Sequence, residues 1–125
     1  MREILFRGKS IDDGKWKYSM SLARHATEDG IITSYYIGSG YDIVKAETVG
    51  QYTGLTDKNA TKIFEGDILK QYGFCYVVSF ENGSYVAYET PYNESAILPR
   101  MDWENAVVIG NIHDNPELLK GGVQK

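Results

Sequence analysis

The sequence predicts a mainly β protein, with an N-terminal β-hairpin subdomain, a small SH3-like β-barrel and one short C-terminal helical turn. Short apolar runs are bounded by turn signals roughly every 8 to 12 residues, as in small barrels and sandwiches. The pairs Asp-Gly and Asn-Gly mark two hairpin turns, and no strong amphipathic helix is present. At 125 residues the chain can bury a core without metal or disulfide. We expect one compact assembly of two parts, residues 1–61 and residues 62–125.

The first 22 residues are typical of a β-hairpin. The runs ILFRGKS and KWKYSMSL flank Asp12-Asp13-Gly14, and Asp-Gly is a strong hairpin signal. Because strand side chains alternate between faces, the hairpin is expected to be amphipathic. The expected apolar face carries Ile4, Phe6, Trp16, Tyr18, Met20 and Leu22. The expected basic face carries Arg7, Lys9, Lys15 and Lys17.

Residues 23–41 contain three glycines and are expected to form one short strand, at 31–37, and a mobile loop. Two short runs follow, YDIVKA and TVGQYTGL. Asp57 to Ala60 then predict a turn, because Asp and Asn side chains bond nearby backbone N–H groups. TKIF follows as a strand, and Gly66 indicates a tight bend before the strand DILKQ.

The stretch GQYTGLTDKNATKIFEGDILK, residues 50–70, raises the question of an acidic active site, because Glu65 and Asp67 lie two positions apart. A glycosidase pair needs a cleft, and a metal needs further ligands that no neighbouring motif supplies. We therefore interpret the stretch as structural, with Gly66 in a conformation that other residues resist and Asp67 bonding local amides. The residues to which we assign this structural role are Gly50, Gly54, Asp57, Asn59, Gly66 and Asp67.

Hairpin signals dominate the C-terminal half. CYVVSF and SYVAYET flank Asn82-Gly83, which favours a type I′ turn. A longer excursion, residues 91–105, carries a short strand near residues 96–98. The apolar run 106–112 predicts a buried final strand. Asn115-Pro116-Glu117 then indicates a helical turn, ended by Gly121-Gly122.

Three stretches resemble the YopX family of phage and prophage proteins: VGQYTGLTDKNATKIFEGDIL at 49–69, VIGNIHDNPELL at 108–119 and the opening REILFRG. Residues 8–48 and 70–106 are not matched residue by residue. Ala60 stands where such proteins usually place glycine. The resemblance implies a mostly β fold, a temperate-phage or prophage origin in a low-GC Gram-positive host, and oligomers as one alternative. It implies no established activity and supplies no catalytic residues.

No residue pattern indicates an enzyme, a metal site or a cofactor. His25 and His113 stand far apart, whereas zinc needs three or four ligands. Cys75 lies between Phe74 and Tyr76 and is expected to be a buried apolar residue. Glycine-rich phosphate loops and nucleophile elbows are absent from the sequence. A single cysteine, an N-terminus unlike a signal peptide and the lack of a long apolar stretch indicate the cytoplasm of a bacterial host cell.

The charge distribution bears on nucleic acid. Residues 1–25 carry six basic and three acidic residues, and the remainder carries seven and fourteen, so +3 and −7 give the net charge of −4. An acidic body argues against general nucleic-acid coating, which needs a broad basic surface. A local phosphate contact by the basic hairpin stays open as an alternative, and its candidates are Arg7, Lys9, Lys15 and Lys17.

Tyrosine side chains are the candidates for contact with a protein partner. Aromatic residues in or beside loops often anchor interfaces. The candidates are Tyr35, Tyr36, Tyr41, Tyr72 and Tyr92. We therefore expect a non-enzymatic phage or prophage accessory protein that binds another, unidentified protein and modulates a host or phage process. Alternatives are a nucleic-acid-binding module and a structural, self-assembling protein; self-association is expected because the N-terminal hairpin exposes an edge.

Overall fold

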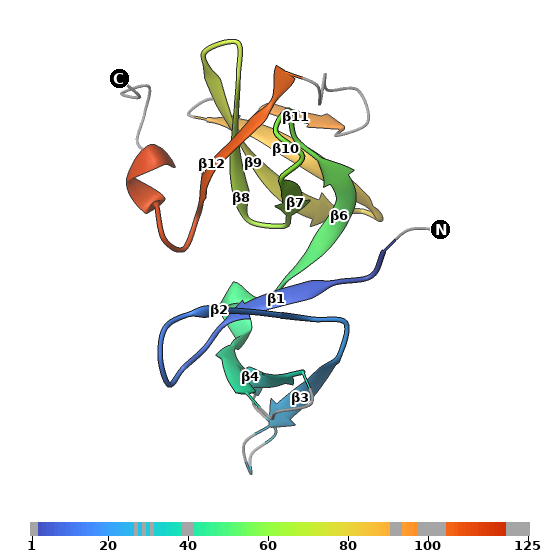
Figure 1. The fold of residues 1–125 in the computed structure, drawn as a ribbon, viewed down its shortest axis with the longest axis vertical. Helices are drawn as coiled ribbons and strands as arrows, with labels where there is room; N and C mark the ends of the chain where they lie inside the picture. The colour runs from blue at the N-terminus through green and yellow to red at the C-terminus, as the bar shows by residue number, and fades with distance from the viewer. Residues whose placement is uncertain are drawn as a thin grey trace. The chain divides into compact units, whose positions relative to one another are not determined.

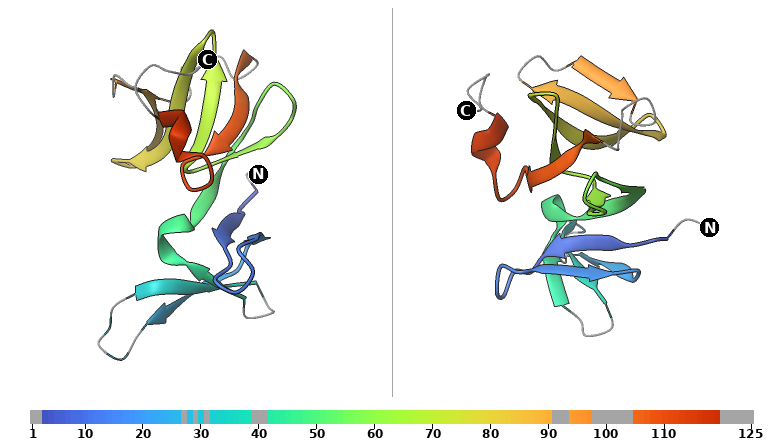
Figure 2. Two further views of the ribbon diagram at one scale, coloured as in Figure 1. Left: turned by 90° about the vertical axis from the view of Figure 1, so that its left-hand side faces the viewer. Right: turned by 45° about the horizontal axis from the view of Figure 1, so that its top comes forward.

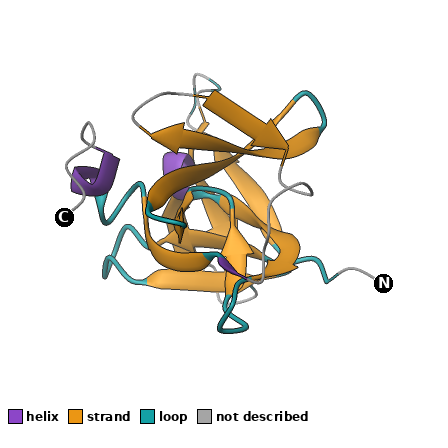
Figure 3. Ribbon diagram, turned by 90° about the horizontal axis from the view of Figure 1, so that it is seen from above, coloured by secondary structure: helices purple, strands orange, loops and turns teal. Residues whose placement is uncertain are grey.

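The computed structural model describes residues 3–26, 28, 30, 32–38, 42–90, 94–97 and 105–119, and it confirms a mainly β fold (Figure 1). Strands make up most of the ribbon, and helices are single short turns (Figure 3). The chain divides into two compact units, Met1–Tyr52 and Thr53–Lys125. The sequence placed this division later, between residues 61 and 62. The earlier division follows from β6, whose hydrogen bonding extends to β7 in the second unit.

The first unit contains two antiparallel arrangements of strands. Strand β1 lies between β2 and β6, while β4 lies between β3 and β5. The elements are β1 (Phe6–Lys9), β2 (Trp16–Ser19), β3 (Leu22–Ala26), β4 (Ile32–Ile37), β5 (Asp42–Lys45), the 3-10 helix η1 (Ala46–Thr48) and the start of β6 (Gly50–Thr56). The strand expected at 31–37 is confirmed as β4, but the expectation that it is the single strand of residues 23–41 is wrong, because β3 also lies there and pairs with β4 (Figure 2, blue to cyan ribbons).

The N-terminal hairpin forms as predicted, and Gly14 adopts a positive φ of 71° in its turn. The Ser10 N–H donates to the Lys15 carbonyl at 2.9 Å, and the Gly14 N–H donates back to Ser10. The Asp13 side chain accepts a hydrogen bond from the Lys15 N–H at 2.9 Å. Polar side chains of the turn thus bond its own backbone, as turn chemistry requires.

The predicted division of the hairpin into an apolar and a basic face is wrong. Arg7 pairs with Tyr18 and Lys9 pairs with Trp16, while Phe6 faces Ser19. Directly paired residues share a face, so Arg7 and Lys9 lie with the aromatic side chains rather than opposite them. The turn length fixes this register, and a shift of one residue exchanges the faces.

Close packing around Gly8 holds the two arrangements of the first unit together. A Cβ atom on Gly8 would lie 2.6 Å from Val44 Cγ2, so only glycine fits there. Val44 is fully buried, and Ile37 joins it in the core. The Ile11 N–H donates to the Ile43 carbonyl at 2.9 Å, which continues the sheet past β5.

The second unit is built on an antiparallel sheet in the order β11-β10-β9-β8-β12. Its elements are β7 (Lys62–Phe64), β8 (Asp67–Gln71), β9 (Phe74–Glu81), β10 (Ser84–Thr90), β11 (Glu94–Ile97), β12 (Val107–Asn111) and the 3-10 helix η4 (Pro116–Leu119). One cluster of buried apolar residues in its core consists of Ile63, Leu69, Val78 and Ala87. In the order β11-β10-β9-β8-β12 the first and last strands do not pair with each other, so the sheet is open. Its closure into an SH3-like barrel stays a prediction.

Most second-unit elements agree with the sequence. The Asn82-Gly83 turn has φ angles of 52° and 82°, which confirms the two positive φ values of a type I′ turn. The helical turn begins at Pro116 as predicted, whereas the Gly121-Gly122 stop lies outside the described residues. Strand β12 is less buried than expected, since it lies at the edge of the sheet and leaves Ile109 exposed.

No helix in the described ranges is long and apolar enough to cross a membrane.

Candidate binding surface

The Asp57 carboxylate joins two of the sequence stretches that carry the family resemblance. Its Oδ1 accepts hydrogen bonds from the Asn59 N–H at 2.8 Å and from the Thr61 N–H at 2.9 Å. Its Oδ2 accepts from the Val108 N–H at 2.8 Å, 51 positions away. Burial opposes ionisation, but the backbone N–H groups outweigh it and lower the pKa of Asp57 below its usual 3.8. The Asp57 carboxylate therefore has a structural role: it connects the turn at residues 57–61 to β12.

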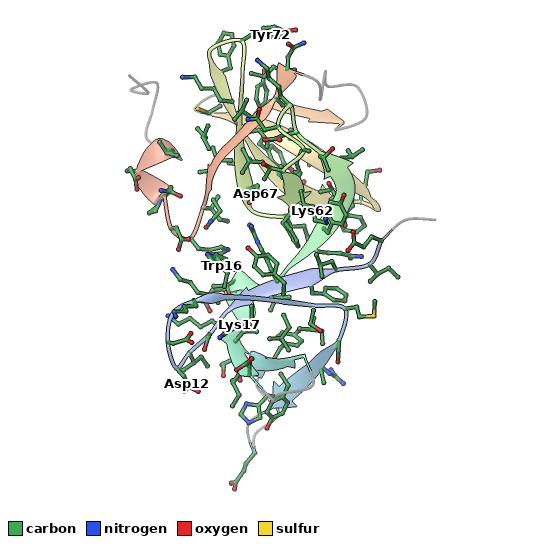
Figure 4. All side chains as sticks on the ribbon, in the orientation of Figure 1. Asp12, Trp16, Lys17, Lys62, Asp67 and Tyr72 are labelled. Atoms are coloured by element: carbon green, nitrogen blue, oxygen red, sulfur yellow. The ribbon has the colours of Figure 1, made fainter. Side chains whose placement is uncertain are left out.

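The Glu65-Gly66-Asp67 step is a backbone junction as well. Gly66 has a φ of 87°, and its N–H donates to the Val78 carbonyl while its own carbonyl accepts from the Ile112 N–H. Asp67 is 2% exposed, and its Oδ2 accepts from the Phe64 N–H at 2.7 Å. These bonds do not create an acidic pair that is open to a substrate. The carboxylate of Asp67, which is labelled in Figure 4, instead stabilises the bend.

Two asparagines organise the end of β12: Asn111, which the sequence analysis did not single out, and Asn115, which it expected as the cap of the helical turn. Asn111 Oδ1 accepts from the N–H groups of His113 and Asp114, at 3.0 and 2.9 Å. The Asn115 side chain accepts from the Asn111 N–H at 3.2 Å. A Cβ on Gly110 would collide with Asn115, so this stretch needs glycine for close approach. The short spacing of Asn, Asp and Gly in GNIHDN was the signal available for this cluster.

The four predicted cations do not gather on one face. The Arg7 guanidinium lies 4.6 Å from the centre of the Trp16 ring, and the Lys9 ammonium lies 5.9 Å from it. Lys17 pairs with Gly8 on the other face and forms an ion pair with Asp13 at 3.2 Å. The backbone N–H of Lys15, followed by the Lys17 ammonium, lowers the pKa of Asp13. Trp16 and Lys17 are labelled in Figure 4.

The tyrosine candidates have different surroundings. Tyr35 and Tyr36 lie within β4, near the end of the strand expected at 31–37, rather than in a loop. As neighbours on a strand they point to opposite faces. Tyr36 packs against His25, with ring centres 4.8 Å apart, and His25 Nδ1 lies 2.8 Å from Ser34 Oγ. Tyr41 and Tyr92 lie outside the described residues.

Tyr72 is the candidate that the structure places at a loop tip. It lies between β8 and β9, where Figure 4 labels it, and forms a two-residue turn with Gly73. The φ angles of the two residues are 52° and 85°. Its side chain is 71% exposed, and Phe74, which follows Gly73, is 49% exposed. We call Tyr72, Gly73 and Phe74 the aromatic tip. The Asn82-Gly83 turn of the same sheet has almost the same φ angles, but it uses asparagine.

The aromatic tip places a bulky residue at positive φ, whereas the Asn82-Gly83 turn uses a residue type that this conformation favours. A side chain at positive φ costs about 1–2 kcal/mol, and Asn tolerates this region better than a bulky residue does. Sequence analysis included Tyr72 among the loop aromatics but did not predict its turn, because tyrosine is not a usual residue for this position.

In the part of the chain that the structure describes, the remaining reactive side chains do not form a cluster. Cys75 is buried as predicted, 3% exposed. Among the residues that the structure describes, no group of three or more His, Cys, Asp or Glu side chains could hold a metal ion.

Taken together, the strand order, the committed carboxylates and the aromatic tip define a small two-unit β protein whose motifs serve its fold. The chain belongs to the YopX family: the family model, described as YopX protein, matches residues 5–120. The fold is similar to the crystal structure of protein EF1440 from Enterococcus faecalis, at 22% identity and a TM-score of 0.56, covering 96% of this chain and 100% of that chain. A search of curated proteins gave no match.

Proposed function

We propose that this protein is a non-enzymatic accessory protein of a phage or prophage that acts by binding another protein. The observation that carries the proposal is the aromatic tip, where Tyr72 combines a positive φ with a largely exposed side chain. Backbone strain of this kind persists where surrounding structure enforces it, and it concentrates at functional positions.

The alternative explanation, that the fold itself requires tyrosine at position 72, is weak. Most of the Tyr72 side chain is exposed, so its ring does not stabilise the fold by burial in the core. The neighbouring hairpin achieves the same backbone geometry with Asn82, which is the residue type that the turn favours. An exposed tyrosine that costs stability fits an interface anchor, since aromatic side chains bury large area with few rotatable bonds.

Two reciprocal substitutions test the proposal. Tyr72→Asn gives the β8–β9 turn the residue of the other turn, and we expect it to stabilise the protein by about 1 kcal/mol. The same variant should lose most capture of a protein partner from bacterial host lysate, measured by cross-linking and mass spectrometry. Asn82→Tyr is the matched control, because it adds the same backbone strain at the other turn, leaves Tyr72 in place and should retain capture.

The salt dependence of capture separates protein from nucleic acid. Binding through an aromatic anchor should change little between two salt concentrations, whereas phosphate contacts weaken steeply with added salt. If Tyr72→Asn captures as well as the parent, or if the material captured is DNA or RNA and Lys15→Ala with Lys17→Ala removes it, the proposal fails.

A further inference from the structure

Asn82 and Gly83, the turn between β9 and β10, form the one Asn-Gly pair of the sequence. Asparagine is a thermally labile residue. Its side-chain carbonyl carbon, Cγ, can be attacked by the backbone nitrogen of the next residue, because the two close a five-membered ring. Glycine in the next position favours this closure, since it has no Cβ to obstruct the approach. Whether the reaction occurs in the folded protein then depends on what surrounds the two groups.

Both residues of this turn are exposed. The strand pairing ends with Glu81 and Ser84, so the two turn residues lie outside the ladder of backbone hydrogen bonds. Within the described ranges, neither the Asn82 side chain nor the Gly83 N–H forms a hydrogen bond. A Cβ atom added to Gly83 would meet no atom of a more distant residue within 4 Å, so no neighbouring group hinders movement of the turn. The side-chain amide and the nitrogen that would attack it are therefore both accessible.

The other asparagines of the described ranges lack an accessible attacking nitrogen. The Ala60 N–H, which follows Asn59, donates to a backbone carbonyl at 3.0 Å. The Ile112 N–H, which follows Asn111, donates to another at 2.9 Å. The nitrogens after the remaining two belong to a fully buried residue and to a proline, which has no N–H: Ala106 and Pro116. The structure thus distinguishes the Asn82-Gly83 pair from all of these.

We propose that Asn82 is a site of spontaneous covalent modification, in which its side-chain amide is converted to an acid through a succinimide. The Gly83 nitrogen bonds to the Asn82 Cγ and loses its hydrogen, while the side-chain nitrogen leaves as ammonia. Water then opens the ring at one of its two carbonyl carbons. Opening at Cγ gives aspartate, and opening at the backbone carbonyl carbon gives isoaspartate. The reaction needs only water, and it does not involve the aromatic tip, so it is independent of the proposed function.

The isoaspartate product changes the backbone of the turn. The main chain then runs through Cβ and Cγ of residue 82 and is one atom longer, which disturbs a two-residue turn that sets the strand register. The rings of Phe80 and Tyr85, 4.8 Å apart, lie just inside this turn. We expect isoaspartate to loosen the β9–β10 hairpin. Ordinary aspartate should preserve it, because Asp-Gly suits the same type of turn.

Mass spectrometry of the aged, folded protein tests the site. The protein is incubated at mildly alkaline pH in water enriched in heavy oxygen and then digested. The peptide that contains residue 82 should gain an acid with one heavy oxygen, as a mixture of aspartate and isoaspartate, the latter detected by labelling with an isoaspartyl methyltransferase. Asn82→Gln is the matched control, because glutamine keeps the amide but would have to close a larger ring, and it should stay unchanged.

Ala60→Gly separates the effect of the structure from that of the Asn-Gly sequence. It creates a second exposed Asn-Gly pair, but there the N–H of residue 60 is bonded to the Asp57 carbonyl. In the folded variant Asn82 should convert about fivefold faster than Asn59, the factor that the net stability of one hydrogen bond gives. In urea the two rates should become similar. Equal rates in the folded variant, a product without isoaspartate, or an amide at position 82 that stays intact while the urea-unfolded chain reacts would each overturn the proposal.

Discussion

Removing the Asp57 carboxylate should destabilise the second unit more than loss of an ordinary surface residue does. Asp57→Ala leaves three backbone N–H groups without the acceptor that they have in the parent. Hydrogen bonds to a charged group contribute about 1.5–3 kcal/mol each, but water can replace the carboxylate at the exposed Asn59 and Thr61. Water reaches the half-buried Val108 N–H less easily and replaces less of its lost hydrogen-bond energy. We therefore expect the free energy of unfolding to fall by about 2–4 kcal/mol.

Asp57→Asn should lie between parent and Asp57→Ala, because the amide keeps one oxygen but presents an NH₂ group toward one of the former donors. Urea unfolding followed by circular dichroism measures the order of the three proteins. Asp13→Ala is the matched control, since that aspartate also bonds turn backbone but is exposed, and its unfolding midpoint should barely move. An Asp57→Ala protein as stable as the parent that nevertheless loses partner capture would refute the structural role.

The pH dependence of the same variants has a defined sign. The folded-state pKa of Asp57 lies below its usual value, so the unfolded chain binds the proton more tightly. The stabilising contribution is therefore complete above the unfolded pKa near 3.8 and is lost as the pH falls through the folded value. The difference in stability between the parent and Asp57→Asn should shrink on acidification.

Three further substitutions test local packing and backbone strain. Ala60→Gly should stabilise the protein by about 0.5–1 kcal/mol in urea unfolding, because Ala60 has a φ of 64° and the cost of positive φ exceeds the entropy cost of glycine; an equal or lower stability would contradict this. Gly8→Ala should cost about 1–3 kcal/mol through overlap with Val44, and the added substitution Val44→Ala should make the cost of the new methyl group much smaller. Asp67→Ala should lower the melting temperature, since the buried Phe64 N–H loses its acceptor, and should leave binding per folded molecule intact; normal melting with lost binding would make Asp67 a site.

Turn chemistry made much of the fold predictable. Asn82-Gly83 and the Asp13-Gly14 step lie in the turns that their preferences indicate. Ala60, noted in the sequence only as a departure from the family's glycine, has the positive φ that explains why glycine is usual there. Local residue preferences act on neighbouring backbone, so a single sequence contains the information needed for them.

Register and long-range contacts were not predictable in the same way. Which of Phe6 and Arg7 shares a face with Trp16 depends on the length of the intervening turn, and the sequence leaves that length open by a residue. The clash that restricts position 8 to glycine requires Val44, which is distant in the chain. Tyr72 was a candidate because its aromatic ring was expected in or beside a loop, and its strained turn emerged only from the backbone angles.

Hydrogen exchange on the captured complex tests the central claim most directly. Amide exchange of the free protein and of the protein cross-linked to its partner would be compared by mass spectrometry, peptide by peptide. The proposed function predicts that protection gained on binding includes residues 71–75, around the aromatic tip, and that Tyr72→Asn removes this gain. Protection confined to other segments, such as the N-terminal hairpin at residues 6–19, would contradict it.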